Sequence, residues 1–179
     1  MKKIAIVGFA VAFLGTGALA QAPEPQKEQE WLKQLAGEWD YETEVTLEAD
    51  KPPMKIKGTE SVRTVGNSWI TAELKATFAD QPFTGILTVG FDAHKKKYLG
   101  TWLDSMHGHL LHYEGTLDVA AKTLTLLTEA PNPADPGKLC KFKEVLEVKS
   151  KDHKIFTTSL QGEDGKWTPM MTINYRRKK

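Results

Sequence analysis

Apolar and polar residues alternate along most of the chain, beginning at Trp39. Between Trp39 and Leu47 one set of alternate positions is mostly apolar, and acidic side chains such as Glu38, Glu42 and Glu44 take the other set. Alternation with a period of two is typical of a β-strand that is buried on one face and solvated on the other. The folded part of the chain is therefore predicted to open with a half-buried strand.

The same pattern recurs as far as the C-terminus and predicts ten strands in all. Short segments rich in Gly, Pro, Asn and Asp separate the strands, and such short connections favour antiparallel neighbours, because a parallel crossover needs about a dozen residues. The predicted strands are residues 39–47, 54–65, 69–78, 83–91, 97–104, 109–117, 123–129, 139–149, 154–161 and 168–177.

A meander of ten strands with one apolar face leaves two open edges, and closure into a barrel protects them most completely. We therefore expect an all-β fold, a single up-and-down antiparallel β-barrel of about ten strands with a short N-terminal helix. Barrels of about eight strands are just wide enough for side chains or one small ligand, so ten strands predict an internal cavity.

The first hairpin is predicted to pair Leu47 with Met54. This register sets Glu44 opposite Lys57 on the outer face of the barrel. Oppositely charged side chains that face each other across two strands favour such a pairing.

A short helix is predicted just before the first strand, over Glu30–Ala36. Trp31, Leu32 and Leu35 fall on one face of this helix. Gly37 follows at the position where a glycine commonly ends a helix. We expect the helix to plug one end of the barrel.

The first twenty residues have the pattern of a secretory signal peptide. A positively charged start, Met1-Lys2-Lys3, precedes an apolar run over residues 4–14 and a small-x-small motif, Ala18-Leu19-Ala20. A membrane anchor is the alternative, but this glycine-interrupted stretch is short for a spanning helix. We expect a signal peptide at residues 1–20, a tether at 21–29 and a barrel domain at 30–179, in a protein that is periplasmic or secreted.

The composition is that of one globular domain of near-neutral charge. The 179 residues include 24 Lys and Arg and 23 Asp and Glu, which gives a formal net charge of +1. A chain this close to neutrality lacks the basic surplus that nucleic-acid binding requires. We expect no nucleic-acid partner and, once the signal segment is removed, no stable membrane insertion of the mature chain.

Cys140 is the one cysteine of the chain, so it cannot form an internal disulfide. It alternates with Phe142, Leu146 and Val148, which favours a small buried hydrophobic residue on a strand over a reactive thiol.

The start of the first strand, Gly37-Glu38-Trp39, is similar to the G-x-W motif of lipocalins and related calycin barrels. In those proteins the tryptophan packs inside the closed end of the barrel, beneath a basic residue of the last strand. Here the last strand supplies Arg176 and Arg177, so the resemblance implies a cation–π contact between Trp39 and one of these arginines.

A wider set of motifs resembles an exported bacterial family known as domain of unknown function 1579, over roughly residues 26–177. The motifs are Gly37-Glu38-Trp39, Lys57-Gly58-Thr59-Glu60, Gly90-Phe91-Asp92, Lys97-Tyr98, Gly100-Thr101-Trp102, Asp104-Ser105-Met106, Tyr113-Glu114-Gly115 and Asn174-Tyr175-Arg176. The resemblance implies a calycin-like barrel and assigns no catalytic residue.

Two acidic residues fall on the predicted inner face, where a carboxylate is costly unless it is paired or hydrogen-bonded. Glu60 shares the inward set, and Asp104 shares the face of Tyr98 and Trp102. Each acid is interpreted as a polar anchor for a ligand, as a general acid or base, as part of an internal salt bridge for which Arg177 is a candidate partner, or as a group in a water-filled lumen. The candidate ligand-binding residues are Tyr41, Glu60, Tyr98, Trp102 and Asp104.

His107 and His109, with Asp104 nearby, are the most suggestive metal-ligand candidates. So short a cluster specifies little, so a solvated loop is the favoured interpretation and no metal is predicted. His94, His112 and His153 are expected to face water. None of the five histidines projects clearly into the barrel as haem ligation requires, so no cofactor is predicted.

Motifs for a catalytic nucleophile are absent from the sequence, so no catalytic residue is assigned. The leading hypothesis is an exported barrel that binds a small, largely apolar ligand in its lumen. An enzyme that uses an inner carboxylate as acid or base is one alternative, and a structural or partner-binding barrel with a filled core is the other.

Overall fold

The computed structural model describes residues 27–45 and 53–179. The predicted signal peptide at residues 1–20, residues 21–26 of the tether, and Leu47 lie outside these residues. The helix is α1 (Lys27–Lys33) and the strands are β1 (Gly37–Val45), β2 (Met54–Val65), β3 (Trp69–Phe78), β4 (Gln81–Asp92), β5 (Lys97–Asp104), β6 (Leu111–Asp118), β7 (Thr123–Asn132), β8 (Asp135–Ser150), β9 (His153–Gln161) and β10 (Trp167–Arg177).

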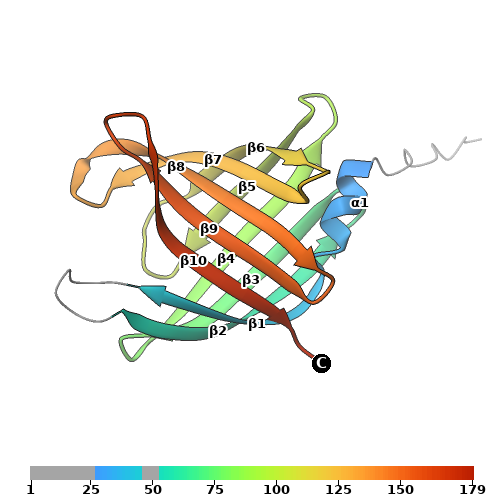
Figure 1. The fold of residues 1–179 in the computed structure, drawn as a ribbon, viewed down its shortest axis with the longest axis horizontal. Helices are drawn as coiled ribbons and strands as arrows, with labels where there is room; N and C mark the ends of the chain where they lie inside the picture. The colour runs from blue at the N-terminus through green and yellow to red at the C-terminus, as the bar shows by residue number, and fades with distance from the viewer. Residues whose placement is uncertain (1–26, 46–52) are drawn as a thin grey trace, which may run out of the picture.

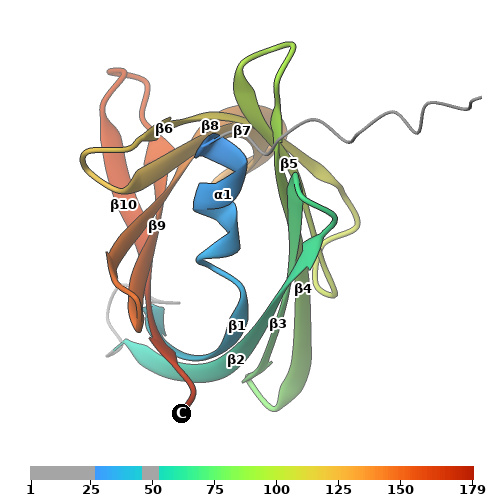
Figure 2. The same cartoon turned by 90° about the vertical axis from the view of Figure 1, so that its right-hand side faces the viewer.

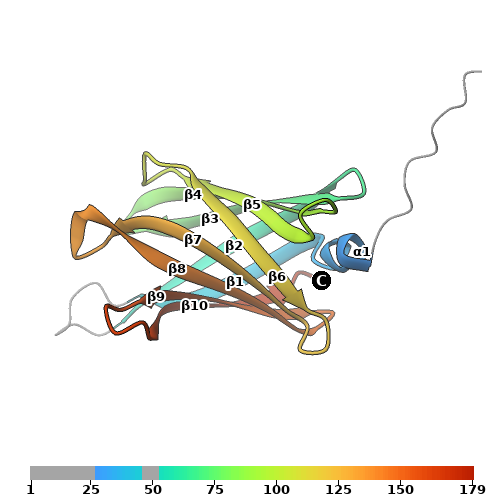
Figure 3. The same ribbon diagram turned by 90° about the horizontal axis from the view of Figure 1, so that it is seen from above.

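The ten strands form one closed antiparallel barrel in which each strand pairs with its sequence neighbours (Figures 1 and 3). The circle closes because β1 pairs with β2 on one side and with β10 on the other. The predicted fold class is confirmed, and it follows from the period-two alternation. In β1, Trp39, Tyr41 and Thr43 are buried inside while Asp40 and Glu42 are exposed.

The register predicted for the first hairpin is wrong by two residues. Met54 pairs with Val45 rather than with Leu47, and Lys57 lies opposite Glu42, with 2.9 Å between their charged atoms. A shift of two keeps every side chain on its face. It also exchanges one Glu–Lys pair for another, so neither the alternation nor the charges can distinguish the two registers.

Several elements begin or end away from their predicted limits. Helix α1 both starts and ends three residues early, at Lys27 and Lys33, so Gly37 opens β1 instead of directly ending the helix. Strand β6 starts at Leu111 rather than His109. Strand β8 starts at Asp135 because the ladder with β7 continues to a pair between Asn132 and Asp135. These differences lie at the ends of elements, where turn residues and ladder residues have similar composition.

Helix α1 lies across one end of the barrel, as the end-on view in Figure 2 shows. Leu32 and Leu35 are almost completely buried, so the apolar face of the segment seals this end. Tyr98 on β5 anchors the helix to the barrel, because its hydroxyl donates a hydrogen bond to the backbone oxygen of Glu28 at 2.8 Å. We call this the closed end and the opposite one the open end.

Arg177, at the end of β10, ties the closed end together. Its guanidinium carbon lies 4.2 Å from the centre of the Trp39 ring, which confirms the contact that the resemblance implied. The guanidinium also donates hydrogen bonds to the backbone oxygens of Ala36 at 2.6 Å and Gln34 at 2.9 Å. Gly37 permits this arrangement, because its φ is +131° and a β-carbon there would overlap Arg177.

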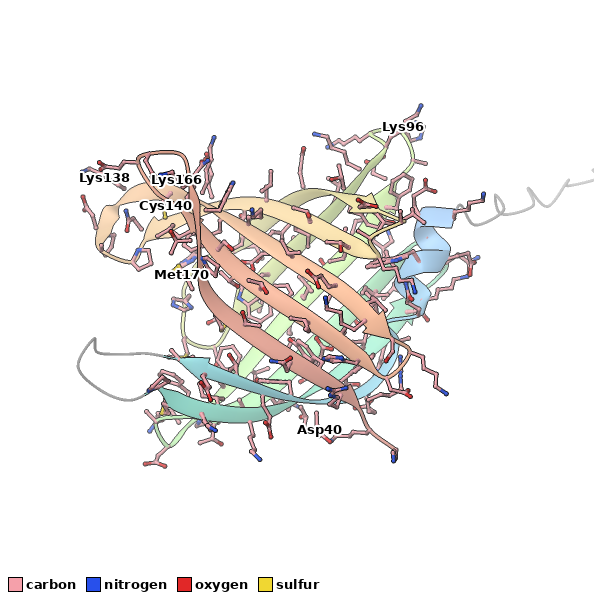
Figure 4. The ribbon with its side chains drawn as sticks, viewed as in Figure 1. Asp40, Lys96, Lys138, Cys140, Lys166 and Met170 are labelled. Atoms are coloured by element: carbon pink, nitrogen blue, oxygen red, sulfur yellow. The ribbon has the colours of Figure 1, made fainter. Side chains whose placement is uncertain are left out.

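Cys140 is half-buried on β8 near the open end, where Figure 4 also shows Lys138, Lys166 and Met170. Its Sγ lies 3.7 Å from the backbone oxygen of Ala130 as a weak donor, and burial raises the pKa of the thiol. A raised pKa lowers the thiolate fraction, which suits the predicted structural role rather than a reactive one.

Replacing Arg177 with methionine is expected to destabilise the protein by about 2–4 kcal/mol. The backbone oxygens that Arg177 contacts lose a charged hydrogen-bond donor, and the Trp39 ring loses its cation–π contact with the guanidinium. Arg176→Met is the matched control, since Arg176 is the exposed neighbour. Urea unfolding followed by tryptophan fluorescence measures both. Equal stability of the two variants would contradict the role given to Arg177.

Candidate functional site

The barrel encloses a cavity of about 330 Å³ that runs from Leu35 at the closed end to His107 at the open end. Its wall is mostly aliphatic and aromatic, with a few polar side chains among the apolar ones. The apolar lining is Leu35, Val62, Ile70, Ala72, Leu74, Phe83, Leu87, Trp102, Leu111, Tyr113, Leu146, Phe156, Met171, Ile173 and Tyr175, and the polar lining is Glu60, Asp104, His107, Glu144, Lys154 and Thr158.

A second hollow, of about 790 Å³, lies along β1 and its neighbours β2 and β10. Its lining is mostly charged or polar, with Glu42, Glu44, Lys55 and Lys57 among the residues. These side chains are well exposed and pair with one another across the strands. A surface of exposed, paired charges is well solvated and offers little apolar contact to a ligand. The inner cavity is therefore the candidate functional site.

A buried ion pair lies toward the closed end of the cavity. Glu60 on β2 and Lys154 on β9 are 4% and 3% exposed, and the Lys154 ammonium donates to Glu60 Oε2. The same ammonium lies 4.6 Å from the centre of the Trp39 ring and 4.5 Å from that of Tyr175. Burial lowers the pKa of Lys154, and the Glu60 carboxylate opposes that shift. This end of the cavity is therefore electrically balanced.

The proposed salt bridge between Glu60 and Arg177 is wrong, although an internal salt bridge exists. Arg177 instead lies 3.7 Å from Asp152 and donates to backbone oxygens at the closed end. Lys154 reaches Glu60 because it points inward from β9, beside Tyr175 in the ladder.

A second buried carboxyl, Glu144 on β8, lies at mid-depth and is 6% exposed. Its Oε2 accepts a hydrogen bond of 2.6 Å from the Thr158 hydroxyl. Burial raises the pKa of Glu144 from 4.5 to about 7, and the Thr158 hydrogen bond opposes the shift. Burial also raises the pKa of Tyr113, with further contributions from the negative charges of Glu144 and Asp104.

Asp104 lies at the open end and is held by four hydrogen bonds. Trp102 Nε1 donates to it at 2.9 Å, the backbone nitrogens of Met106 and His107 donate at 2.8 and 2.9 Å, and His107 Nδ1 lies 3.0 Å away. Burial acts to raise the pKa of Asp104, but the hydrogen bonds outweigh it and hold that pKa below its usual value. Asp104 is therefore an ionised group with its donors already in place.

Of the five predicted ligand-binding residues, Glu60, Trp102 and Asp104 line the cavity. Tyr41 and Tyr98 are buried inside the barrel but belong to its packing. Tyr41 packs on Tyr175, with 5.4 Å between ring centres, and burial raises its pKa to about 12.

Sequence reasoning missed Glu144 and Lys154, two buried polar residues of the cavity wall. A signal for each existed. Glu144 falls in the same alternate set as Cys140 and Leu146, and Lys154 shares its set with Phe156. A polar residue within an otherwise apolar alternate set points inward like its neighbours.

The histidines do not gather into a metal centre. Among residues 27–45 and 53–179, no three His, Cys, Asp or Glu side chains are placed to hold a metal ion. The His107 and His109 rings pack together with 5.5 Å between centres, and His107 is 59% exposed at the open end. His94 and His112 are exposed.

The prediction that His153 faces water is wrong. It is half-buried, and its Nε2 is buried without a hydrogen-bond partner among the described residues. His153 is the first residue of β9 rather than a turn residue, and it pairs with Arg176 and Ser150. The sheet therefore covers its ring, which a turn would have left in solvent.

The architecture is that of a calycin-like barrel, a closed antiparallel sheet with an apolar lumen and a helix across one end. The chain belongs to the family described as protein of unknown function, DUF1579, whose profile matches residues 24–177. None of the helices that the structure describes is long and apolar enough to span a membrane.

A solved structure of low sequence identity has the same fold. Rv2717c from M. tuberculosis is similar with a TM-score of 0.63 and 12% identity, covering 86% of this chain and 99% of that one. A redesigned β-barrel, mFAP1, bound to DFHBI, matches with a TM-score of 0.41 and 13% identity, covering 82% and 97%. No curated protein matches the chain.

The buried carboxyl predicts a pH dependence of stability. Between pH 4.5 and about 7 the folded protein keeps a Glu144 proton that the unfolded chain has lost, so stability falls as pH rises through this window. Between pH 4 and 8 the wild type should lose about 3 kcal/mol relative to Glu144→Gln, which has no such proton.

Urea unfolding of the two proteins at several pH values measures this difference, with the exposed Glu129→Gln as the control. A stability difference between the wild type and Glu144→Gln that does not change with pH would show that Glu144 titrates normally.

Proposed function

We propose that this protein binds a small, largely apolar molecule in the lumen of its barrel. The observation that carries the proposal is the cavity of about 330 Å³ with apolar walls and few polar groups. Pockets for small molecules span about 300–1,000 Å³ and have this kind of lining. Well-packed interiors contain few voids larger than a water molecule, so a filled structural core accounts poorly for this volume.

Exposed apolar side chains at the open end support access for such a molecule. Met106, Leu110 and Met170 are each about half exposed, and the first two belong to the connection between β5 and β6 that borders the cavity. Figure 4 shows Met170 at the same end, away from α1. Exposed apolar groups beside a concave site are a common feature of ligand-binding surfaces.

Catalysis by an inner carboxylate is the second candidate, and Glu144 is the residue that favours it. A pKa of about 7 suits a general acid or base near neutral pH. A reaction in the lumen requires a bound molecule first, so a test of lumen binding applies to both candidates.

We further propose that the protein acts after export, in the periplasm or outside the cell. When it is expressed in a Gram-negative bacterium, the soluble periplasmic fraction should contain a chain that begins at Gln21. Intact mass measurement gives the N-terminus directly. A full-length chain confined to the cytoplasm would contradict export.

Blocking the lumen should abolish binding of an apolar probe. Leu87 on β4 lines the cavity, whereas its neighbour Ile86 is more than one-third exposed on the outside. Titration with the neutral dye N-phenylnaphthylamine should produce a fluorescence increase with the wild type and with Ile86→Trp. With Leu87→Trp the apparent affinity should fall at least about tenfold, because the indole occupies the space of the dye.

Circular dichroism confirms that each variant is folded before the titration. Binding by Leu87→Trp that equals binding by Ile86→Trp would place the dye outside the lumen and overturn the proposal.

A further inference from the structure

We infer that the lumen selects a small apolar amine, whose ammonium group pairs with the Glu144 carboxylate. This inference rests on the proposed function and specifies the chemical class of the ligand. It follows from the way in which charge is balanced along the cavity.

Glu144 is the one lumen carboxyl, among the residues that the structure describes, that lacks a positively charged or multiple-donor partner. Glu60 has the Lys154 ammonium, and Asp104 has four nitrogen partners, two of them on His107. Glu144 has the Thr158 hydroxyl on Oε2, and no residue in 27–45 or 53–179 donates a hydrogen bond to its Oε1. One oxygen of a buried carboxyl is therefore available in a space of ligand size.

The missing partner of such a group is a hydrogen-bond donor, and a cation is the strongest one. The fold has already removed the Glu144 side chain from water, so a bound ammonium group would supply the positively charged partner that the buried carboxylate lacks. Charge-assisted hydrogen bonds between an ammonium group and a carboxylate are about twice as strong as neutral ones.

The rest of the lumen disfavours an anionic ligand. The one lysine that lines the cavity, Lys154, is already paired with Glu60. Glu144 and Asp104 would both repel a carboxylate or phosphate in a space of low dielectric constant. An acid of the same size and shape should therefore be excluded.

The aromatic wall of the lumen also favours a cation. Tyr113, Phe156 and Trp102 line the cavity together with Tyr175. The face of Tyr175 already contacts the Lys154 ammonium at 4.5 Å from the ring centre, so the wall offers a cation–π contact that offsets part of the cost of desolvating an ammonium group.

The test uses phenethylamine, phenethyl alcohol and phenylpropionate, which share an apolar skeleton and differ in the polar group. Displacement of N-phenylnaphthylamine and calorimetry at pH 8 give their affinities. The amine should bind at least about tenfold more tightly than the alcohol, and the acid more weakly than both. In Glu144→Gln the amine should lose this advantage, while the alcohol binds as it does to the wild type.

Asp104→Asn is the matched control, because it changes another lumen carboxyl to its amide and should keep the preference for the amine. Amine binding to the wild type should also weaken relative to alcohol binding between pH 8 and 5.5, as Glu144 gains its proton. The other titratable or charged groups that line this space are Glu60, Asp104, His107, Tyr113, Lys154 and Tyr175. His107→Gln should leave the pH dependence in place.

The outcomes separate this inference from the proposed function. Equal affinity for the amine and the alcohol in the wild type, with both displacing the dye, would overturn the inference and leave lumen binding intact. No dye binding to the wild type would overturn the proposed function itself. Because the comparison of amine with alcohol and its pH dependence use the wild type, an unstable Glu144→Gln does not remove the test.

Discussion

Closure of the sheet between β1 and β10 is the constraint on which the rest of the molecule depends. Once β1 pairs with both β2 and β10, the inward side chains face one shared interior, which helix α1 seals at the closed end. Apolar residues fill part of that space, while each inward polar residue must find a partner across it. The Glu60–Lys154 pair satisfies this requirement between strands that are far apart in sequence.

The polar groups of the lumen differ in how completely their charges and hydrogen bonds are matched by protein partners. The cavity therefore differs in polarity between its closed end, its middle and its open end. At the closed end the charges of Glu60 and Lys154 balance beneath Trp39 and Arg177. At the open end Asp104 has its donors in place. Between them Glu144 has one hydroxyl partner in an apolar surrounding. This arrangement supports the proposal that the lumen binds a molecule with a polar end.

The sequence predicted the fold well because strand alternation, short turns and edge protection all point to the same closed sheet. It also placed Glu60, Trp102 and Asp104 on the lumen side, since facing depends only on the period of two. The register of the first hairpin was missed because a shift of two preserves every face. The alternation also indicates that Glu144 and Lys154 face inward, but it does not show which side chains they meet there: Thr158 on the next strand and Glu60 on a strand remote in sequence.

The central claim is that the closed sheet surrounds a hollow that small apolar species can reach. Crystals of the protein held under xenon pressure test it directly, because xenon occupies apolar cavities without needing a polar partner. The account predicts xenon density inside the barrel, among Leu87, Phe156 and Ile173. A barrel whose interior is filled by its own side chains, with xenon confined to the outer surface, would contradict it.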